Sequence, residues 1–222
     1  MLERFRRLYA DLMTPAARIA VALRMTPDLV TWLGTVLVVV VALVMVPQGR
    51  LWQGALAIAV CVLTDGVDGQ MARMTGKGSS YGAFLDSTLD RVADGAIFGA
   101  VALYYAGRGD SVLWAGVAIG ALVMGQVTSY AKARGLALGF KVWGGLAARG
   151  DRLLALLLGM LLTGLGLAWA LPVALAYLLC ASSFTVLQRM GQVKRQAAEA
   201  QDAGVTMVDP QATVAAEHQK KP

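Results

Sequence analysis

The chemically distinctive part of this sequence is the segment Thr64–Asp94, which holds five of the 14 acidic residues of the chain. These are Asp65, Asp68, Asp86, Asp90 and Asp94. The first two are three residues apart and the next two are four apart, so each pair shares one face of a helix. Carboxylates held close together repel one another and stay ionised only beside cations. Oxygen ligands without histidine or cysteine favour Mg²⁺, Mn²⁺ or Ca²⁺, and two ions sharing four aspartates suit phosphoryl transfer.

The elements that must position these acids are membrane helices. The chain is 57% hydrophobic and 15% charged, whereas an ordinary soluble domain is about 45–50% apolar and about 25% charged. A spanning helix needs about 20 mostly apolar residues. Six segments are of this kind: 29–47, 51–72, 82–106, 111–131, 153–170 and 171–188. We therefore expect an all-α polytopic membrane protein with six transmembrane helices, the last two separated near Pro172 because proline ends or kinks a helix.

The distribution of positive charge predicts the orientation of these spans. Arginine and lysine gather before the first span, in the second and fourth connections and after the sixth span, whereas Arg50 and Arg108 lie on the other side. The positive-inside rule then places both termini and the aspartates in the cytoplasm. On a membrane protein, the net charge of +6 indicates contact with lipid headgroups rather than with nucleic acid.

The predicted membrane domain, residues 26–195, lies between two segments of different composition. Residues 1–25 place apolar side chains three or four apart between arginines, which predicts an N-terminal amphipathic helix lying on the cytoplasmic membrane surface. Residues 196–222 are rich in alanine, glutamine and glutamate, and we expect a disordered cytoplasmic tail there.

The acidic segment forms a single motif when its spacings are written out. It reads Asp65-x2-Asp68-Gly69-x2-Ala72-Arg73-x8-Gly82-x3-Asp86-x3-Asp90. This motif resembles the full signature of the CDP-alcohol phosphotransferase family, without departure at any fixed position. The six-helix membrane architecture of that family also agrees with the six spans, so the resemblance covers about residues 24–195. It implies an enzyme of phospholipid biosynthesis in the bacterial cell membrane. Such an enzyme transfers a substituted phosphate from a CDP-linked lipid to an alcohol and releases CMP.

The resemblance also implies roles for the aspartates. Asp65, Asp68 and Asp86 would bind two metal ions, Mg²⁺ or else Mn²⁺. Asp90 would complete the second metal site and act as the base that removes the proton of the attacking hydroxyl. Family members form homodimers, and we expect a homodimer here too.

A second set of residues would bind the CDP-lipid. By resemblance these are Asp28, Leu29, Val30, Thr31, Gly69, Arg73 and Ser79. The guanidinium of Arg73 suits phosphate, and Gly69 lets the backbone approach it closely. The stretch from Thr26 to Thr31 resembles the family's Thr-Pro-Asn-x-x-Thr entry to the first helix, with aspartate in place of asparagine. We expect Asp28 to cap that helix.

The acceptor is predicted from basic residues at the ends of the later spans. These are Lys132, Arg134, Arg149, Arg152 and Arg189. If they converge, they form a cationic pocket for an acceptor that carries phosphate; otherwise they are positive-inside charges. The segments Ser129–Arg134 and Asp151–Leu153 resemble the actinobacterial phosphatidylinositol-phosphate synthases of the family, which implies inositol phosphate as the acceptor. Glycerol 3-phosphate, which would give phosphatidylglycerophosphate, is the nearest alternative.

Two further interpretations concern the same acids. Asp94 continues the face of Asp90 one turn deeper but lies outside the signature. We therefore expect it to support the metal ligands from behind or to join two helices, with Arg91 as a candidate partner, rather than to bind metal. A divalent-cation transporter is the alternative from another functional class. It would place carboxylates near the middle of the bilayer, and the predicted cytoplasmic position of the aspartates argues against it.

Overall fold

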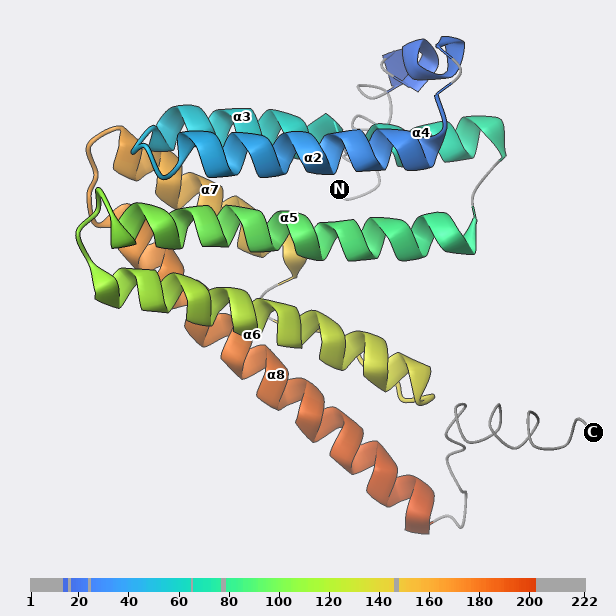
Figure 1. Ribbon diagram of the computed structural model, residues 1–222. Coiled ribbons are helices and arrows are strands. Elements are labelled where there is room, and N and C mark those ends of the chain that lie inside the picture. The colour runs from blue at the N-terminus through green and yellow to red at the C-terminus, as the bar shows by residue number, and fades with distance from the viewer. Residues whose placement is uncertain are drawn as a thin grey trace, which may run out of the picture.

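The described part of the chain is a bundle of helices. The computed structural model describes residues 14–15, 17–23, 25–64, 66–76, 79–145 and 148–202 and contains no strand among them. The helices are α2 (Pro27–Met45), α3 (Leu51–Thr64), α4 (Gly66–Thr75), α5 (Ser80–Ala106), α6 (Val112–Ala137), α7 (Arg149–Gly164) and α8 (Ala170–Asp202) (Figure 1). The all-α class expected from the sequence is therefore confirmed.

Three of the described helices, α2, α6 and α8, are long and apolar enough to cross a membrane. The second predicted span, 51–72, coincides with α3 and most of α4. Helix α3 ends at Thr64 and α4 begins at Gly66. The predicted separation of the last two spans is confirmed, since α7 ends at Gly164 and α8 begins at Ala170. Pro172 lies in the first turn of α8, where a backbone N–H would have no partner within the helix.

The predicted disordered tail begins too early. Helix α8 continues to Asp202, so residues 196–202 are helical. The rest of the predicted tail, 203–222, lies outside the described residues. Alanine, glutamine and glutamate are strong helix formers, and adding residues to an existing helix avoids the cost of nucleation.

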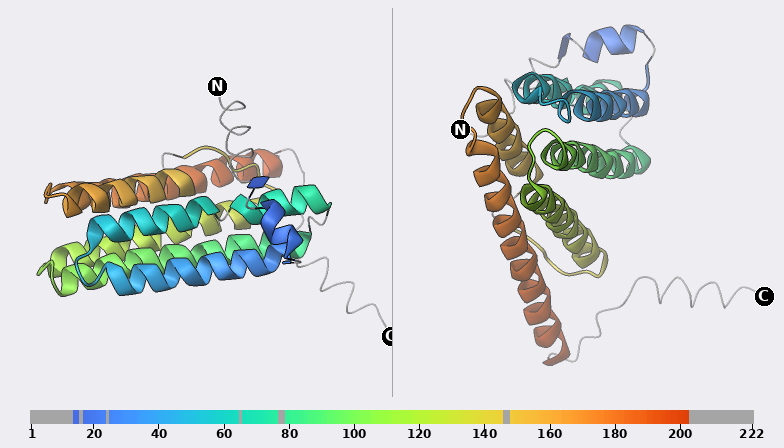
Figure 2. Two further views of the ribbon diagram at one scale, coloured as in Figure 1. Left: turned by 90° about the horizontal axis from the view of Figure 1, so that it is seen from above. Right: turned by 60° about the vertical axis from the view of Figure 1, so that its left-hand side comes forward.

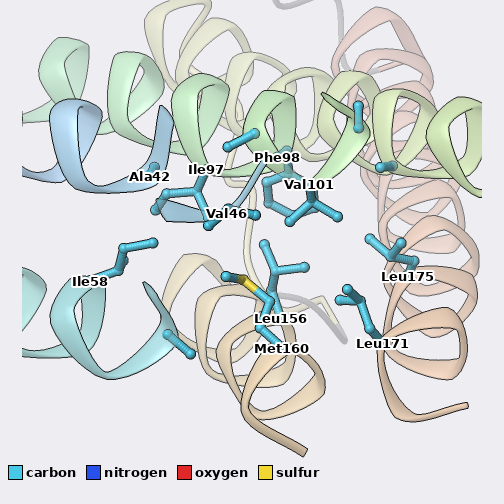
Figure 3. Close-up of a cluster of buried hydrophobic side chains, with 14 of the residues drawn as sticks. Ala42, Val46, Ile58, Ile97, Phe98, Val101, Leu156, Met160, Leu171 and Leu175 are labelled. Atoms are coloured by element: carbon cyan, nitrogen blue, oxygen red, sulfur yellow. The ribbon is translucent and has the colours of Figure 1, made fainter. Parts of the chain in front are cut away.

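The core lies where six of the described helices meet. Helix α2 packs on α3 and α5, α6 packs on α5 and α8, and α7 packs on α3 and α8; α8 slants across the others (Figures 1 and 2). The labelled side chains of Figure 3 come from α2, α3, α5, α7 and α8 and converge in one cluster, to which α6 adds Ala115, Ala118 and Ala121. The largest fully buried ones include Ile58, Ile97, Leu156, Met160, Leu171 and Leu175. This apolar core fixes α5, α6, α7 and α8 relative to one another.

The described part of the N-terminal segment packs on α4. Residues 17–22 are helical, and Ala17 and Ala20 are buried against Val67 and Met71. Ile19 and Leu23, two of the side chains used to predict an amphipathic helix, are largely exposed. Residues 1–13 lie outside the described residues, so the amphipathic helix stays a prediction.

Candidate functional site

The first group of predicted site residues meets at the start of α5. The backbone N–H of Gly82 donates to Oγ of Ser79 over 2.9 Å, which caps the helix. A Cβ atom placed on Gly82 would lie 3.2 Å from that Oγ and 3.4 Å from Oδ1 of Asp28. Because glycine has no side chain, α2 and the α5 cap come together here. The structure thus brings Asp28 and Ser79, both predicted to contact the CDP-lipid, to one junction.

The entry to α2 differs from the prediction. Thr26, rather than Asp28, is the N-cap, and its side chain accepts a hydrogen bond from the backbone N–H of Leu29 over 3.3 Å. The physical reason is Pro27, which fixes the first helical position and makes the preceding residue extended. Asp28 instead lies in the first turn, where a negative charge is favourable.

The other predicted CDP-lipid contacts face different environments. Leu29 is exposed, Val30 is half-buried and Thr31 is buried, with its hydroxyl donating to the carbonyl of Pro27 over 3.1 Å. In α4, Gly69 and Arg73 are exposed. A Cβ atom on Gly69 would meet no atom of the described chain within 4 Å, so there is room beside this backbone for a phosphate.

The predicted metal ligands are described only in part. Asp86 is exposed, and the side chain of Asp90, one turn further along α5, is 14% exposed. Asp68 lies in α4, but its side chain, like all of Asp65, is outside the described residues. Among the described side chains, no group of three or more histidine, cysteine, aspartate or glutamate residues could hold a metal. The pair on α5 supplies carboxylate oxygens, which fit Mg²⁺ or Mn²⁺.

A cavity of about 710 Å³ lies between α5, α6, α7 and α8. Four of the five predicted acceptor residues line it: Lys132, Arg149, Arg152 and Arg189. The structure does not bring Arg134 there, since this residue lies in the last turn of α6 outside the lining. Ser129 and Tyr130, from the segment Ser129–Arg134 used to predict the acceptor, also line it. Sequence reasoning missed other lining residues from α5 and α6, namely Ser87, Arg91, Gln126 and Thr128.

An ion-pair network connects this cavity to α5. Nη1 of Arg149 lies 2.8 Å from Oδ1 of Asp90, and Nε of the same arginine lies 3.3 Å from Oδ1 of Asp94. Nη2 of Arg152 lies 3.3 Å from the other oxygen of Asp94. The expected pairing of Asp94 with Arg91 is wrong, because two arginines of α7 take its oxygens, and Arg91 lies 3.5 Å from Asp90 instead.

The cavity also holds donors that suit an anion. Arg189 is buried and donates through Nη1 to the carbonyl of Thr128 and through Nη2 to that of Gly144, the latter over 3.1 Å. The Nε atoms of Arg91 and Arg189 are buried and have no hydrogen-bond partner within the described part of the chain. Leaving such a donor unsatisfied is costly, and because both Nε atoms are buried, they are not exposed to the cavity.

The connection from α6 to α7 is fixed by glutamines that sequence reasoning missed. Gln192 bonds both backbone groups of Trp143, and Gln196, one turn further, bonds both backbone groups of Lys141. Together with Arg189, they form one face of α8 that holds residues 141–144. The spacing of Arg189, Gln192 and Gln196, three and four residues apart, could have indicated one shared helical face. This signal was missed because the predicted disordered tail started at Gln196.

A model of the CDP-alcohol phosphatidyltransferase family matches residues 24–187. The chain belongs to this family. As a CDP-alcohol phosphatidyltransferase it is a bacterial membrane enzyme, and the transporter alternative is set aside. The phosphatidylinositol phosphate synthase of Cutibacterium acnes is 47% identical over 205 residues, which cover 88% of this chain and 98% of that protein. The synthase of the same name from Streptomyces avermitilis is 43% identical over 211 residues, with 91% and 86% covered.

Solved structures of a related enzyme share the fold. The crystal structure of Mycobacterium tuberculosis phosphatidylinositol phosphate synthase with CDP-DAG bound is similar to this CDP-alcohol phosphatidyltransferase with a TM-score of 0.79. It is 38% identical, and 82% of this chain and 94% of that one are covered. The structure of that enzyme in complex with manganese and citrate gives a TM-score of 0.76, with 82% and 88% covered.

Proposed function

We propose that this CDP-alcohol phosphatidyltransferase transfers the phosphatidyl group of CDP-diacylglycerol to inositol phosphate, releasing CMP and forming phosphatidylinositol phosphate. The observation that carries the proposal is the convergence of Lys132, Arg149, Arg152 and Arg189 on one cavity beside Asp90. These residues come from α6, α7 and α8, so only the fold brings them together. The names of the similar enzymes support the same acceptor.

The cavity chemistry favours an acceptor that carries its own phosphate. Arginine presents a planar fork of donors that matches phosphate oxygens, and the four arginines and one lysine of the lining supply more positive charge than an uncharged polyol requires. Glycerol 3-phosphate satisfies the same rule, so it is the competing acceptor. Inositol phosphate is the larger of the two, and a cavity of about 710 Å³ has room for its ring.

Asp90 is the group that we assign as the base. Its carboxylate adjoins the cavity through the contact with Arg149, so a hydroxyl of an acceptor held by its phosphate would lie near it. The acceptor oxygen forms a bond to the phosphorus next to the lipid, the bond from that phosphorus to the CMP oxygen breaks, and the proton passes to Asp90. A direct displacement of this kind needs no protein nucleophile.

The nucleotide end of the donor is assigned to the junction of α2, α4 and α5. Asp28 and Ser79 meet at Gly82, and Gly69 and Arg73 lie on the exposed side of α4. Leu29, Val30 and Thr31 complete the set on the first turns of α2. We propose that Asp65, Asp68, Asp86 and Asp90 hold two Mg²⁺ ions, with Mn²⁺ as a substitute. Bound there, the metal would neutralise charge on the pyrophosphate.

The topology and assembly are part of the same proposal. Six spans would place both termini and the aspartates on the cytoplasmic side, with residues 1–25 on the membrane surface. A homodimer is supported by small residues that face open space. A Cβ atom on Gly95, Gly99 or Gly116 would meet no atom within 4 Å in the described chain, so these surfaces leave room for close helix contact with a second copy.

A substrate panel tests the proposal. Purified enzyme in detergent is given labelled CDP-diacylglycerol and, in turn, inositol phosphate, glycerol 3-phosphate, inositol and serine, and the labelled lipid product and CMP are measured. We expect turnover with inositol phosphate above all others. Asp90→Asn is the matched negative control, which should lose turnover while it still binds CDP-diacylglycerol. Preferred use of glycerol 3-phosphate would overturn the acceptor, and retained turnover of Asp90→Asn would overturn the base.

A further inference from the structure

Asp94 is a buried carboxylate to which the proposed chemistry gives no role. It is 6% exposed and lies one turn beyond Asp90 on α5. A buried carboxylate costs several kcal/mol unless it is paired and hydrogen-bonded. Both oxygens are paired here, Oδ1 with Nε of Arg149 and Oδ2 with Nη2 of Arg152, each over 3.3 Å. Asp94 therefore joins α5 to the first turn of α7.

The two partners are lining residues of the acceptor cavity, and their orientation depends on this contact. The planar guanidinium of Arg149 is held at two atoms, Nε by Asp94 and Nη1 by Asp90. Arg152 is 3% exposed and lies over Gly125 of α6, where an added Cβ atom would come within 3.2 Å of its Nε. A guanidinium fixed at its edges presents its other N–H groups in one direction.

We propose that Asp94 is a positioning residue for acceptor binding, which holds Arg149, with Arg152 fixed beside it, so that the guanidinium of Arg149 serves the acceptor phosphate. The inference rests on the proposed function, because it takes the cavity as the acceptor site. The half-buried Arg149 and the buried Arg152 carry like charges that repel each other, and the carboxylate between them offsets that repulsion. Asparagine at this position would have no charge and would direct an NH₂ group toward one of the guanidinium groups.

We predict that replacing Asp94 changes the KM of the acceptor but not the KM of the CDP-lipid. With Asp94→Asn, the KM for inositol phosphate should rise at least about tenfold, whereas the KM for CDP-diacylglycerol should stay within about twofold. The reason is that the residues assigned to the nucleotide lie elsewhere in the fold, in α4 and at the start of α2 and α5. Asp110→Asn is the matched control. It removes the same charge from an exposed residue at the other end of α5, and asparagine accepts its positive φ of 41°.

Two further variants separate positioning from general packing. Asp94→Glu keeps the charge and should raise the acceptor KM less than Asp94→Asn, and it serves as the test if the asparagine variant does not fold. If Asp94 acts through Arg149, Asp94→Asn should raise the acceptor KM little further in an Arg149→Gln background. Fully multiplicative effects, or an equal rise in both KM values together with a lower thermal midpoint, would overturn the inference.

The wild-type enzyme is measured first, so that failure of the proposed function can be recognised separately. If it prefers glycerol 3-phosphate, inositol phosphate is wrong as the acceptor, and the same Asp94 variants are then measured with glycerol 3-phosphate, with the same expected rise in KM. If it uses unphosphorylated inositol as well as it uses inositol phosphate or glycerol 3-phosphate, the cavity does not recognise a phosphate group, and both proposals are overturned.

Discussion

Nη1 of Arg149 lies 2.8 Å from Oδ1 of Asp90, so the first residue of α7 touches the aspartate that the signature assigns as the base. The same guanidinium reaches Asp94 through Nε. Because Asp90 and Asp94 are on α5, the side chain of Arg149 connects α5, which carries the second half of the signature, with the cavity. Binding of the acceptor and removal of its proton would therefore depend on a shared residue.

Arg149→Lys should lower kcat/KM for the acceptor at least about tenfold. A lysine ammonium is a compact charge without a planar fork, so it cannot bridge both carboxylates in this geometry. Initial rates at varied acceptor concentration measure the effect. Arg134→Lys is the matched control, since Arg134 does not line the cavity, and it should change kcat/KM less than about twofold. An equal loss in both variants would show that the cavity is not the acceptor site.

Asp86→Asn should weaken metal binding. Manganese added to the wild-type enzyme should raise its thermal midpoint, because a ligand that binds only the folded state stabilises it. The variant should show a smaller rise at the same concentration and need more metal for turnover after chelation. Asp151→Asn removes an exposed carboxylate from α7 and should respond like the wild type. A full manganese response in Asp86→Asn would contradict the assignment of Asp86 as a ligand.

Replacing both Gln192 and Gln196 by alanine should release the connection between α6 and α7. Each side chain makes two hydrogen bonds to the backbone of residues 141–143, and each such bond contributes about 1 kcal/mol net. Hydrogen exchange of the backbone amides of residues 141 and 143 should become faster by at least about tenfold. Gln201→Ala changes an exposed glutamine of the same helix and should leave these amides unchanged. Unaltered exchange in the double variant would rule out the contact.

Gly164→Ala should destabilise the contact between α7 and α3. An added Cβ atom would approach the backbone nitrogen of Trp52 to 2.4 Å, and overpacking of this kind costs about 1–3 kcal/mol. The thermal midpoint in detergent should therefore fall. Gly191→Ala makes the same change within α8, where the Cβ atom would meet no described atom within 4 Å, and it should not lower the midpoint. A fall of equal size in both variants would show that close packing at Gly164 is not the cause.

Local features of the sequence were enough for the helical class and the reaction family. Spans of apolar residues must be helical, because a backbone in lipid has to satisfy its own hydrogen bonds. The spacing from Asp65 to Asp90 follows the helical repeat, so shared faces could be predicted without a fold. Errors arose where a neighbouring residue changed the local geometry, as Pro27 did when it made Thr26 the cap of α2.

Only the tertiary structure decided which distant charges meet. The sequence could not choose between a pocket and positive-inside charge for Lys132, Arg149, Arg152 and Arg189, because that choice depends on how α6, α7 and α8 cross. It named Arg91 as the partner of Asp94, yet the packing of the core brings arginines of α7 to that carboxylate. Helical periodicity fixes relations within a turn or two, whereas contacts between helices depend on core packing, which no single segment encodes.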